Sequence, residues 1–472
     1  MAALAAMLLE KGIAVTGSDQ AMYPPMSDFL AQKGIEVREG YGPQNLDRDV
    51  DMAVIGNSLS RGNEEVEAVL ERRIPYRSMP EVLRTLFLEG RRPLVVAGTH
   101  GKTTTASILS WILLEAGYDP SFLVGGIPKG LGAGYRLGRG ELFVVEGDEY
   151  DSAFFDKRPK FLHYTPWLVT LGAVEFDHAD IYKDLEQMLK AYRMLLRVVP
   201  RSGRLVVNAQ DHLAMELARS SPCPVVTCSL GPEATWVVRD IRTEGGRVHF
   251  RVLKGGRVLG ECSWEVLGRH NLLNALLALA AAHEAGIEEM QGLEALASFQ
   301  GVKRRLELIG KEGGVLVYDD FAHHPTAIKA GLRALRELYP HSRLWAVLEP
   351  RSNSMCRKVF QGELPFAFMA AHRVIVAGVH RADRIPMEER LDPEALVRAI
   401  GDLGPRAWHI PEVEQIVEFL RAELIAGDVV CIMSNGGFGG IHGMLLEALA
   451  GSRETGTSAR PPTNASPAGR FT

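Results

Sequence analysis

The chain has 472 residues, of which 46% are hydrophobic and 24% charged, and its formal net charge is −5. This length exceeds one ordinary hydrophobic core and predicts about three domains. A nucleic-acid partner is disfavoured because the chain lacks the surplus of Lys and Arg that neutralises phosphates. No apolar run reaches the ~18 residues that span a bilayer. The five cysteines include no CxxC pair, so we expect a cytoplasmic protein. We also expect no membrane partner, and of the oligomeric states, which the sequence does not determine, we favour a monomer.

The first region, residues 1–92, alternates short apolar runs with helical patterns, which is typical of an α/β domain. The chain opens inside a helical pattern at residues 1–11, and the first apolar run follows at residues 13–16. Small polar residues follow two of the runs, namely Ser18 and Asp19, and Asn57 and Ser58. An open parallel sheet places its ligand crevice at such strand ends. We therefore expect a ligand near these four residues, and a strand missing ahead of the first helix.

A phosphate-binding loop is predicted where the second α/β unit begins. The apolar residues 94–97 run into the segment GTHGKTTT and then into a helical stretch at residues 106–116. A strand, a glycine-rich turn and a helix N-terminus present backbone N–H groups to phosphate oxygens. In this arrangement Lys102 contacts the β and γ phosphates and the Thr103 hydroxyl binds Mg²⁺. Val96 stands at the position of the first glycine in the usual motif GxxxxGK[ST], so the loop is a shorter variant. The alternative is that Gly-Lys-Thr occurs in this loop by chance, without a phosphate-binding role.

Two acidic segments follow predicted strands of the same unit. Residues 142–145 lead into EGDE, residues 146–149, and residues 167–171 precede EFDHAD, residues 175–180. A carboxylate at the end of a buried strand is costly unless it is paired or binds a metal. A solvated acidic turn is the ordinary interpretation of such a segment. Beside a phosphate loop, we favour the metal site.

Together these segments resemble the Mur ligase family, which joins an amino group to a carboxylate of a UDP-linked cell-wall sugar with ATP. The resemblance continues through GRHNLLNA, residues 268–275, KRRLE, residues 303–307, and YDDFAHHPT, residues 318–326. It implies a Rossmann-like N-terminal domain, residues 1–92, whose first strand is missing. It also implies a P-loop ATPase-like central domain, residues 93–300, and a doubly wound Rossmann-like C-terminal domain, residues 301–450. Residues 451–472 have the composition of a disordered tail.

The resemblance assigns roles to individual residues. The expected ATP-binding residues are Gly98, Thr99, His100, Gly101, Lys102, Thr103, Thr104, Asn271, Asn274, Arg305 and Asp320. The expected Mg²⁺ ligands are Thr103, Glu146 and His178, and the expected catalytic residues are Lys102, Glu146, His178 and Arg305. The UDP-sugar residues are Ser18, Asp19, Asn57, Ser58 and Arg136. A helix N-cap for the asparagines and an exposed basic linker for residues 303–305 are the alternatives.

The C-terminal domain is expected to select the acceptor amine. Its segment LEPRSNSM, residues 348–355, replaces the QPHRYTR segment of the branch that accepts L-alanine. Together with residues 150–158 and 433–442, it resembles the branch that accepts the tripeptide L-alanyl-γ-D-glutamyl-meso-diaminopimelate. The expected peptide-contacting residues are His323, Arg351, Ser352 and Asn353, although His323 and His324 also suit a capped helix start. The L-alanine ligase, a P-loop ATPase that drives a partner and an inactive binder of UDP-sugar or ATP are the alternatives.

The resemblance implies a two-step reaction. ATP phosphorylates the lactyl carboxylate of UDP-N-acetylmuramate, and the peptide amine then attacks the acyl phosphate. Two departures stand out. The family begins with a strand and a glycine-rich turn for the uridine diphosphate, which we expect to be encoded upstream of residue 1; the alternative is that binding of the uridine diphosphate is impaired. Gly172 and Ala173 stand where relatives have asparagine, and Arg193 replaces the modified lysine of some members, as in the muramate-specific branch.

Overall fold

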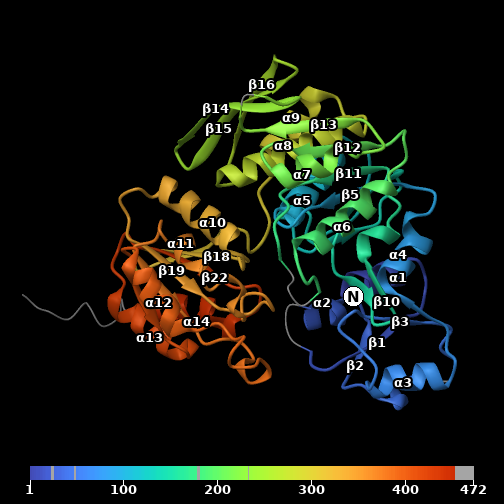
Figure 1. Ribbon diagram of the computed structural model, residues 1–472, viewed down its shortest axis with the longest axis horizontal. Helices are drawn as coiled ribbons and strands as arrows, with labels where there is room; N and C mark the ends of the chain where they lie inside the picture. Colours follow the sequence, from blue (N-terminus) through green and yellow to red (C-terminus); the bar gives the residue numbers. More distant parts are fainter. Residues whose placement is uncertain (23–25, 47–48, 178–180, 232, 452–472) are drawn as a thin grey trace, which may run out of the picture. The chain divides into compact units, whose positions relative to one another are not determined.

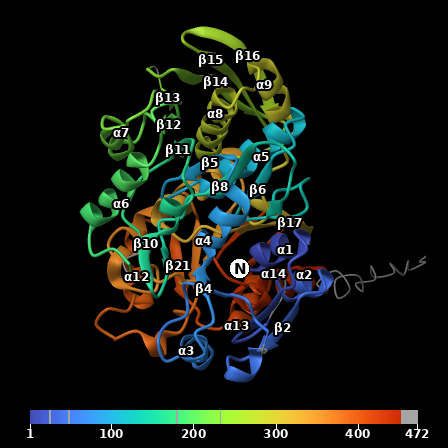
Figure 2. The same ribbon diagram turned by 90° about the vertical axis from the view of Figure 1, so that its right-hand side faces the viewer.

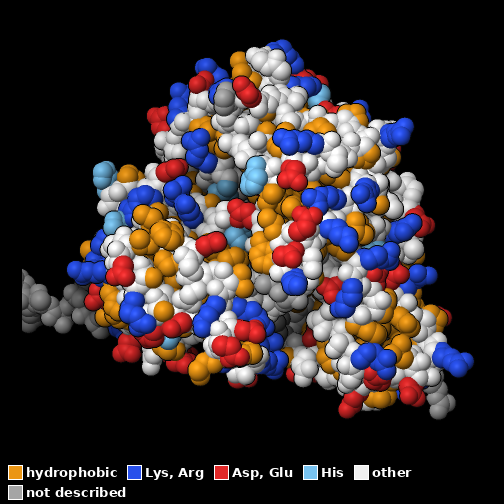
Figure 3. All heavy atoms as spheres, in the orientation of Figure 1, with side chains coloured by type: hydrophobic (Ala, Val, Ile, Leu, Met, Phe, Trp, Pro, Cys, Tyr) orange, Lys and Arg blue, Asp and Glu red, His pale blue; other side chains and the backbone are white. Residues whose placement is uncertain are grey.

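The computed structural model describes residues 1–22, 26–46, 49–177, 181–231 and 233–451. The chain divides into two compact units, Met1–Lys303 and Arg304–Thr472. Among the residues in these described ranges, no helix is both long and apolar enough to cross a membrane. Basic and acidic side chains are interspersed on the face in Figure 3, in keeping with 53 basic and 58 acidic residues in the chain.

The N-terminal part of the first unit contains short parallel strands. Strand β1 (Thr16–Asp19) pairs with β2 (Glu36–Glu39), and β3 (Ala53–Ile55) pairs with β4 (Tyr76–Ser78). Within the described residues they form two separate two-stranded sheets. The accompanying helices in Figure 1 are α1 (Ala2–Glu10), α2 (Met26–Gln32), α3 (Glu64–Glu71) and α4 (Met79–Leu83), which continues as a π-helical turn at Arg84–Leu88.

The central part of the first unit is built on a ten-stranded mixed sheet. Its order is β16-β15-β14-β13-β12-β11-β5-β8-β6-β7. The strands are β5 (Arg92–Ala97), β6 (Ser121–Leu123), β7 (Tyr135–Arg136), β8 (Leu142–Glu146), β11 (Leu168–Leu171), β12 (Arg204–Asn208), β13 (Val225–Ser229), β14 (Trp236–Glu244), β15 (Arg247–Lys254) and β16 (Arg257–Trp264). Strands β14 to β16 and β7 pair antiparallel at the two ends, while the strands between them are parallel.

Strand β5 is buried on both faces, as its unbroken apolar run predicts. Leu94 and Val96 pack in a core with α5 (Lys102–Glu115), α8 (Arg269–Glu284) and α9 (Glu289–Ala297). Val95 and Ala97 pack in a second core with α1, α4, α6 (Leu185–Arg197) and α7 (His212–Ala218). Figure 2 shows α6 and α7 on one side of the sheet and α5, α8 and α9 on the other, and Figure 1 shows the same helices around the strands. The sheet therefore fixes the carboxyl end of β5, where the phosphate loop begins.

A small hairpin that follows β8 packs against the N-terminal part of the first unit. It consists of β9 (Asp151–Ala153) and β10 (Asp156–Pro159), which pair antiparallel. At its tip, Phe154 packs against a separate hydrophobic cluster formed by Ile55, Val66 and Val69. The hairpin thus buries apolar surface against β3 and α3, which belong to the N-terminal part.

The second unit is a six-stranded sheet in the order β17-β18-β22-β19-β20-β21. The strands are β17 (Glu307–Glu312), β18 (Val315–Asp320), β19 (Leu344–Leu348), β20 (Arg373–Val376), β21 (Arg406–His409) and β22 (Val429–Met433). Only the edge strand β17 pairs antiparallel. The helices are α10 (Pro325–Leu338), α11 (Leu364–Ala367), α12 (Pro393–Asp402), α13 (Val413–Glu423) and α14 (Ile441–Gly451), and α13 and α14 share a core with one face of the sheet.

Candidate active site

Two glycines shape the loop between β5 and α5. Gly98 has φ +126° and Gly101, the N-cap of α5, has φ +79°, a region that side chains with a Cβ rarely adopt. A Cβ on Gly98 would lie 3.0 Å from the Ala173 carbonyl oxygen, and one on Gly101 would lie 2.3 Å from Asn274 Oδ1. Both positions therefore need glycine for conformation and for close approach.

The loop is braced by the segment that follows β11. The Thr99 N–H donates to the Ala173 carbonyl at 2.7 Å, and the Thr99 hydroxyl donates to the Glu175 carbonyl at 2.9 Å. The Glu175 N–H donates back to the same hydroxyl at 2.9 Å, and His100 Nε2 lies 3.1 Å from Glu175 Oε2. Residues 173–175 thus hold two of the predicted ATP-binding residues. Apart from the position of the acidic segment after a strand, no sequence pattern indicated this brace.

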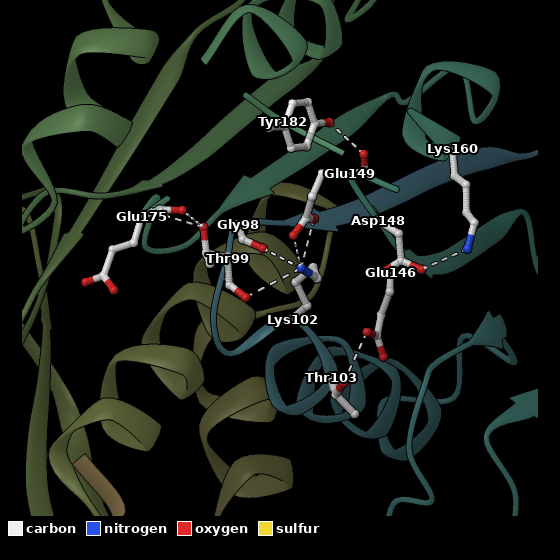
Figure 4. A network of polar contacts seen from close by, with 10 residues as sticks. All are labelled: Gly98, Thr99, Lys102, Thr103, Glu146, Asp148, Glu149, Lys160, Glu175 and Tyr182. Carbon is white, nitrogen blue, oxygen red and sulfur yellow. Dashed lines mark hydrogen bonds and ion pairs between the residues drawn. The ribbon is translucent and has the colours of Figure 1, made fainter. Parts of the chain in front are cut away.

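Lys102, at the first position of α5, lies in a pocket of acceptors (Figure 4). Its Nζ lies 2.9 and 3.0 Å from the two carboxylate oxygens of Glu149, and it donates to the Gly98 carbonyl at 2.7 Å. Burial opposes the charged form of Lys102. The carboxylates, led by Glu149 and followed by Asp148 and Glu146, outweigh burial and raise the pKa of the ammonium above its ordinary value. The lysine is thus a charged group at the helix N-terminus, where a phosphate would enter.

The predicted metal ligands from β8 and α5 are neighbours. The Thr103 hydroxyl donates to Glu146 Oε2 at 3.1 Å, and the Gly125 N–H donates to Glu146 Oε1. The structure therefore brings Thr103 and Glu146 together as predicted, with two oxygen donors side by side at the helix start. Such oxygens suit a hard cation. The third predicted ligand, His178, lies outside the described residues.

The predicted adenine-binding asparagines occupy the first turns of α8 and are both buried. Asn271 Nδ2 donates to the Leu267 carbonyl at 2.7 Å, and Asn274 Nδ2 donates to Asn271 Oδ1 at 3.1 Å. The N-cap of α8 is Gly268, so neither asparagine is the N-cap that the alternative required. Asn274 also lies against Gly101 of the phosphate loop. The pair therefore connects α8 to the loop, and their contact with adenine stays a prediction.

The predicted UDP-sugar residues lie at three places. Ser18 and Asp19 lie inside β1 and not after it. The strand was expected at residues 13–16, but its pairing with β2 runs from Thr16 to Asp19. Asn57 and Ser58 form the exposed turn after β3. Arg136, in β7, donates to the Pro120 carbonyl at 2.9 Å and pairs with Asp119 at 2.5 Å. Its guanidinium therefore holds the segment before β6.

In the second unit, the predicted ATP residues surround the end of β18. Arg305 lies over the ring of Phe321, 4.7 Å from its centroid. Burial raises the pKa of Asp320 to about 7, although the Arg305 guanidinium favours the charged carboxylate. His323 Nδ1 lies 2.9 Å from the Phe321 carbonyl. His324 is the N-cap of α10 and accepts from the Thr326 N–H at 3.2 Å, as the capped helix start predicted.

The predicted acceptor residue Arg351 is positioned by groups that the sequence did not indicate. Its guanidinium lies 3.2 Å from Glu349 Oε1, and the Ser434 hydroxyl donates to the other oxygen of Glu349. A Cβ on Gly436 would lie 2.0 Å from Arg351 Nε, so a side chain there would displace the guanidinium. The Ser352 hydroxyl accepts from the Met355 N–H at 3.2 Å. The segments after β19 and β22 therefore meet at Arg351.

Three family descriptions match successive parts of the chain. They are "Mur ligase family, catalytic domain" over residues 1–91, "Mur ligase middle domain" over residues 96–282, and "Mur ligase, glutamate ligase domain" over residues 304–436. These matches cover the phosphate loop, the asparagines of α8 and the Arg351 segment.

Relatives resemble the chain over nearly its whole length. It is 42% identical to the UDP-N-acetylmuramate–L-alanyl-gamma-D-glutamyl-meso-2,6-diaminoheptandioate ligase of Escherichia coli (strain K12), over 96% of this chain and 97% of the relative. A murein peptide ligase structure from Psychrobacter arcticus 273-4 matches with 35% identity and a TM-score of 0.74, covering 95% of this chain and 96% of that one. A UDP-N-acetylmuramate–L-alanine ligase of Clostridium kluyveri (strain ATCC 8527) is 33% identical, over 92% of this chain and 93% of the relative. The chain belongs to the Mur ligase family of ATP-dependent, amide-forming enzymes.

Proposed function

We propose that the chain joins the lactyl carboxylate of UDP-N-acetylmuramate to the amine of L-alanyl-γ-D-glutamyl-meso-diaminopimelate, with ATP as the phosphoryl donor. The observation that carries this proposal is the 42% identity to a ligase named for these substrates, which extends over 96% of the chain. The proposed domains are residues 1–92 for the UDP-sugar, residues 93–300 for ATP and residues 301–450 for the acceptor.

The phosphate loop supports the role proposed for ATP. Gly98 and Gly101 place no Cβ at the two crowded points of the loop, and Lys102 places a charged ammonium at the start of α5. A helix N-terminus with a cation beside it favours phosphate oxygens. The oxygens of Thr103 and Glu146 would hold Mg²⁺, which when bound neutralises charge on the phosphates. We assign the third ligand position to His178.

The chemistry explains why the reaction needs this arrangement. A carboxylate is a poor acyl donor because its leaving group would be oxide, whereas an acyl phosphate releases phosphate. The lactyl carboxylate attacks the γ-phosphorus, ADP leaves, and Lys102 and Arg305 stabilise the negative charge on the transferred phosphoryl oxygens. The acceptor amine then attacks the acyl carbon, loses a proton and expels phosphate. Positioning both substrates contributes most of the rate enhancement.

The acceptor segment favours the tripeptide over L-alanine. Arg351, held between Glu349 and Gly436, offers a planar guanidinium to a peptide carboxylate. The tripeptide carries carboxylates on its glutamyl and diaminopimelyl residues, beyond the single one of L-alanine. The L-alanine ligase remains the second candidate, because a relative with that name is 33% identical over 92% of the chain.

Phosphate release tests the reaction class. The purified chain with ATP and Mg²⁺ should release phosphate at least tenfold faster when UDP-N-acetylmuramate and the tripeptide are both present than when either is left out. UDP-N-acetylglucosamine, which lacks the lactyl carboxylate, is the matched control and should not support release. Equal release with ATP alone would indicate an ATPase that drives another process and would contradict the ligase.

A further inference from the structure

The three carboxylates at the end of β8 and directly after it have different partners. Figure 4 shows that they point in different directions from one short segment. The contacts are Glu146 with Thr103, Asp148 with Lys160 at 3.7 Å, and Glu149 with Lys102. Only the first of these contacts belongs to the proposed metal site. The partner of Glu149 is instead the cation of the phosphate loop, which suggests a separate role.

The contact between Glu149 and Lys102 fixes the direction of the ammonium. Both carboxylate oxygens lie within 3.0 Å of Nζ, and the Gly98 carbonyl accepts at 2.7 Å from another side. An ammonium has three protons and no acceptor, so these contacts orient most of its donors. Lysine otherwise has a flexible stem of four carbons, which would have to be ordered when a phosphate binds.

Burial keeps the Glu149 carboxylate paired with Lys102. Its side chain is 0% exposed, and the Lys102 side chain is 12% exposed. A buried charge without its partner is strongly destabilising, so neither group can turn away to water without cost. The backbone is fixed too, because the Tyr182 hydroxyl donates to the Glu149 carbonyl at 2.6 Å. This hydrogen bond therefore helps to hold the backbone that carries the carboxylate.

We propose that Glu149 is a positioning residue for nucleotide binding: its carboxylate holds the Lys102 ammonium in place at the phosphate loop. Glu149 acts through Lys102 and contacts no phosphate itself, since its own charge would repel one. This inference rests on the nucleotide site of the proposed function. It adds a residue from the acidic segment whose role differs from the metal-binding role of Glu146.

Calorimetric titration with Mg²⁺ and adenylyl imidodiphosphate tests the proposal without the other substrates. Glu149→Gln keeps the shape of the side chain and should weaken binding at least tenfold. Glu149→Asp keeps the charge and should bind at least threefold more tightly than Glu149→Gln. The control is Glu141→Gln, which precedes the same strand and breaks an exposed ion pair with Arg92, and it should bind like the wild type.

A double-variant cycle separates positioning from a general structural effect. If Glu149 acts through Lys102, the Lys102→Ala/Glu149→Gln protein should bind no more weakly than Lys102→Ala. The double variant should also melt at a higher temperature than Lys102→Ala, because it leaves no buried carboxylate that has lost its lysine. This comparison of melting temperatures tests whether Glu149 and Lys102 act as a pair, even if Glu149→Gln alone does not fold.

Three results would overturn the proposal. Glu149→Gln could bind within twofold of the wild type, the losses of the two single variants could multiply in the double variant, or the double variant could melt below Lys102→Ala. Each leaves the proposed function intact, provided that the wild type binds the nucleotide analogue. Failure of the wild type to bind it would instead contradict the proposed function.

Discussion

At the residue scale, the phosphate loop shows what a sequence pattern can and cannot predict. The pattern GTHGKTT predicted a strand, a turn and a helix start, because Gly-Lys-Thr between an apolar run and a helical stretch has few other structural interpretations. The structure confirms that arrangement, with β5 ending at Ala97 and α5 beginning at Lys102. The partners of the loop could not be predicted. Glu149 and Glu175 reach it through strand pairing of β5 with β8 and β11, which sequence spacing does not encode.

Gly101→Ala tests the close packing of the loop. The added Cβ would lie 2.3 Å from Asn274 Oδ1 at φ +79°, so the loop must shift away from α8. We expect nucleotide affinity to fall at least tenfold, measured by the same calorimetric titration. The matched control is Gly117→Ala, which has the same φ of +79° but no atom within 4 Å of its Cβ. It carries the conformational strain without the clash and should bind like the wild type.

An equal loss of affinity in both glycine variants would show that backbone strain, and not contact with Asn274, limits the loop. Wild-type affinity in Gly101→Ala would contradict the packing of α8 against the loop. Either result would remove the structural reason given for glycine at this position.

At the element scale, strongly apolar strands were predictable and polar ones were not. The second unit shows the contrast. Its apolar runs at residues 315–318, 344–348, 374–377 and 429–433 correspond to β18, β19, β20 and β22. The edge strands β17 and β21 were missed, because ELIGKE and RAWH are short and partly polar and so form no apolar run. In the N-terminal part β2, with the sequence EVRE, escaped prediction for the same reason.

The hairpin β9–β10 provides a prediction about stability at this scale. Phe154 packs against Ile55, Val66 and Val69, so Phe154→Ala should destabilise the N-terminal part by about 2 kcal/mol, less than a fully buried phenylalanine would cost. Trypsin should then cleave after Arg72 or Arg73 on the order of 30-fold faster, if local opening governs cleavage. Phe366→Ala makes the same change at a side chain that is 52% exposed and should leave the cleavage rate unchanged. Unchanged cleavage in Phe154→Ala would show that the hairpin does not stabilise β3 and α3.

At the scale of the whole molecule, the family could be predicted because its motifs are spread along the chain. Each of the segments can also be explained without a functional role, but few other interpretations account for their order and spacing together. The segments are residues 98–105, 146–149, 268–275 and 318–326. The relatives confirm that prediction over nearly the whole length. Acceptor choice is harder to predict, because the proposed acceptor residue Arg351 is positioned by side chains such as Glu349 and Ser434, which meet only after β19 and β22 pair.

The most direct test of the central claim is a competition between acceptors. The chain is incubated with ATP, Mg²⁺ and UDP-N-acetylmuramate, together with equal concentrations of L-alanine and L-alanyl-γ-D-glutamyl-meso-diaminopimelate. Mass spectrometry of the nucleotide products then measures which amine has been joined. We predict that the UDP-N-acetylmuramyl tripeptide exceeds the alanine product at least tenfold, because Arg351 is proposed to bind a glutamyl or diaminopimelyl carboxylate, which L-alanine lacks. A product that is mainly UDP-N-acetylmuramyl-L-alanine, or no ligated product from either amine, would contradict this account.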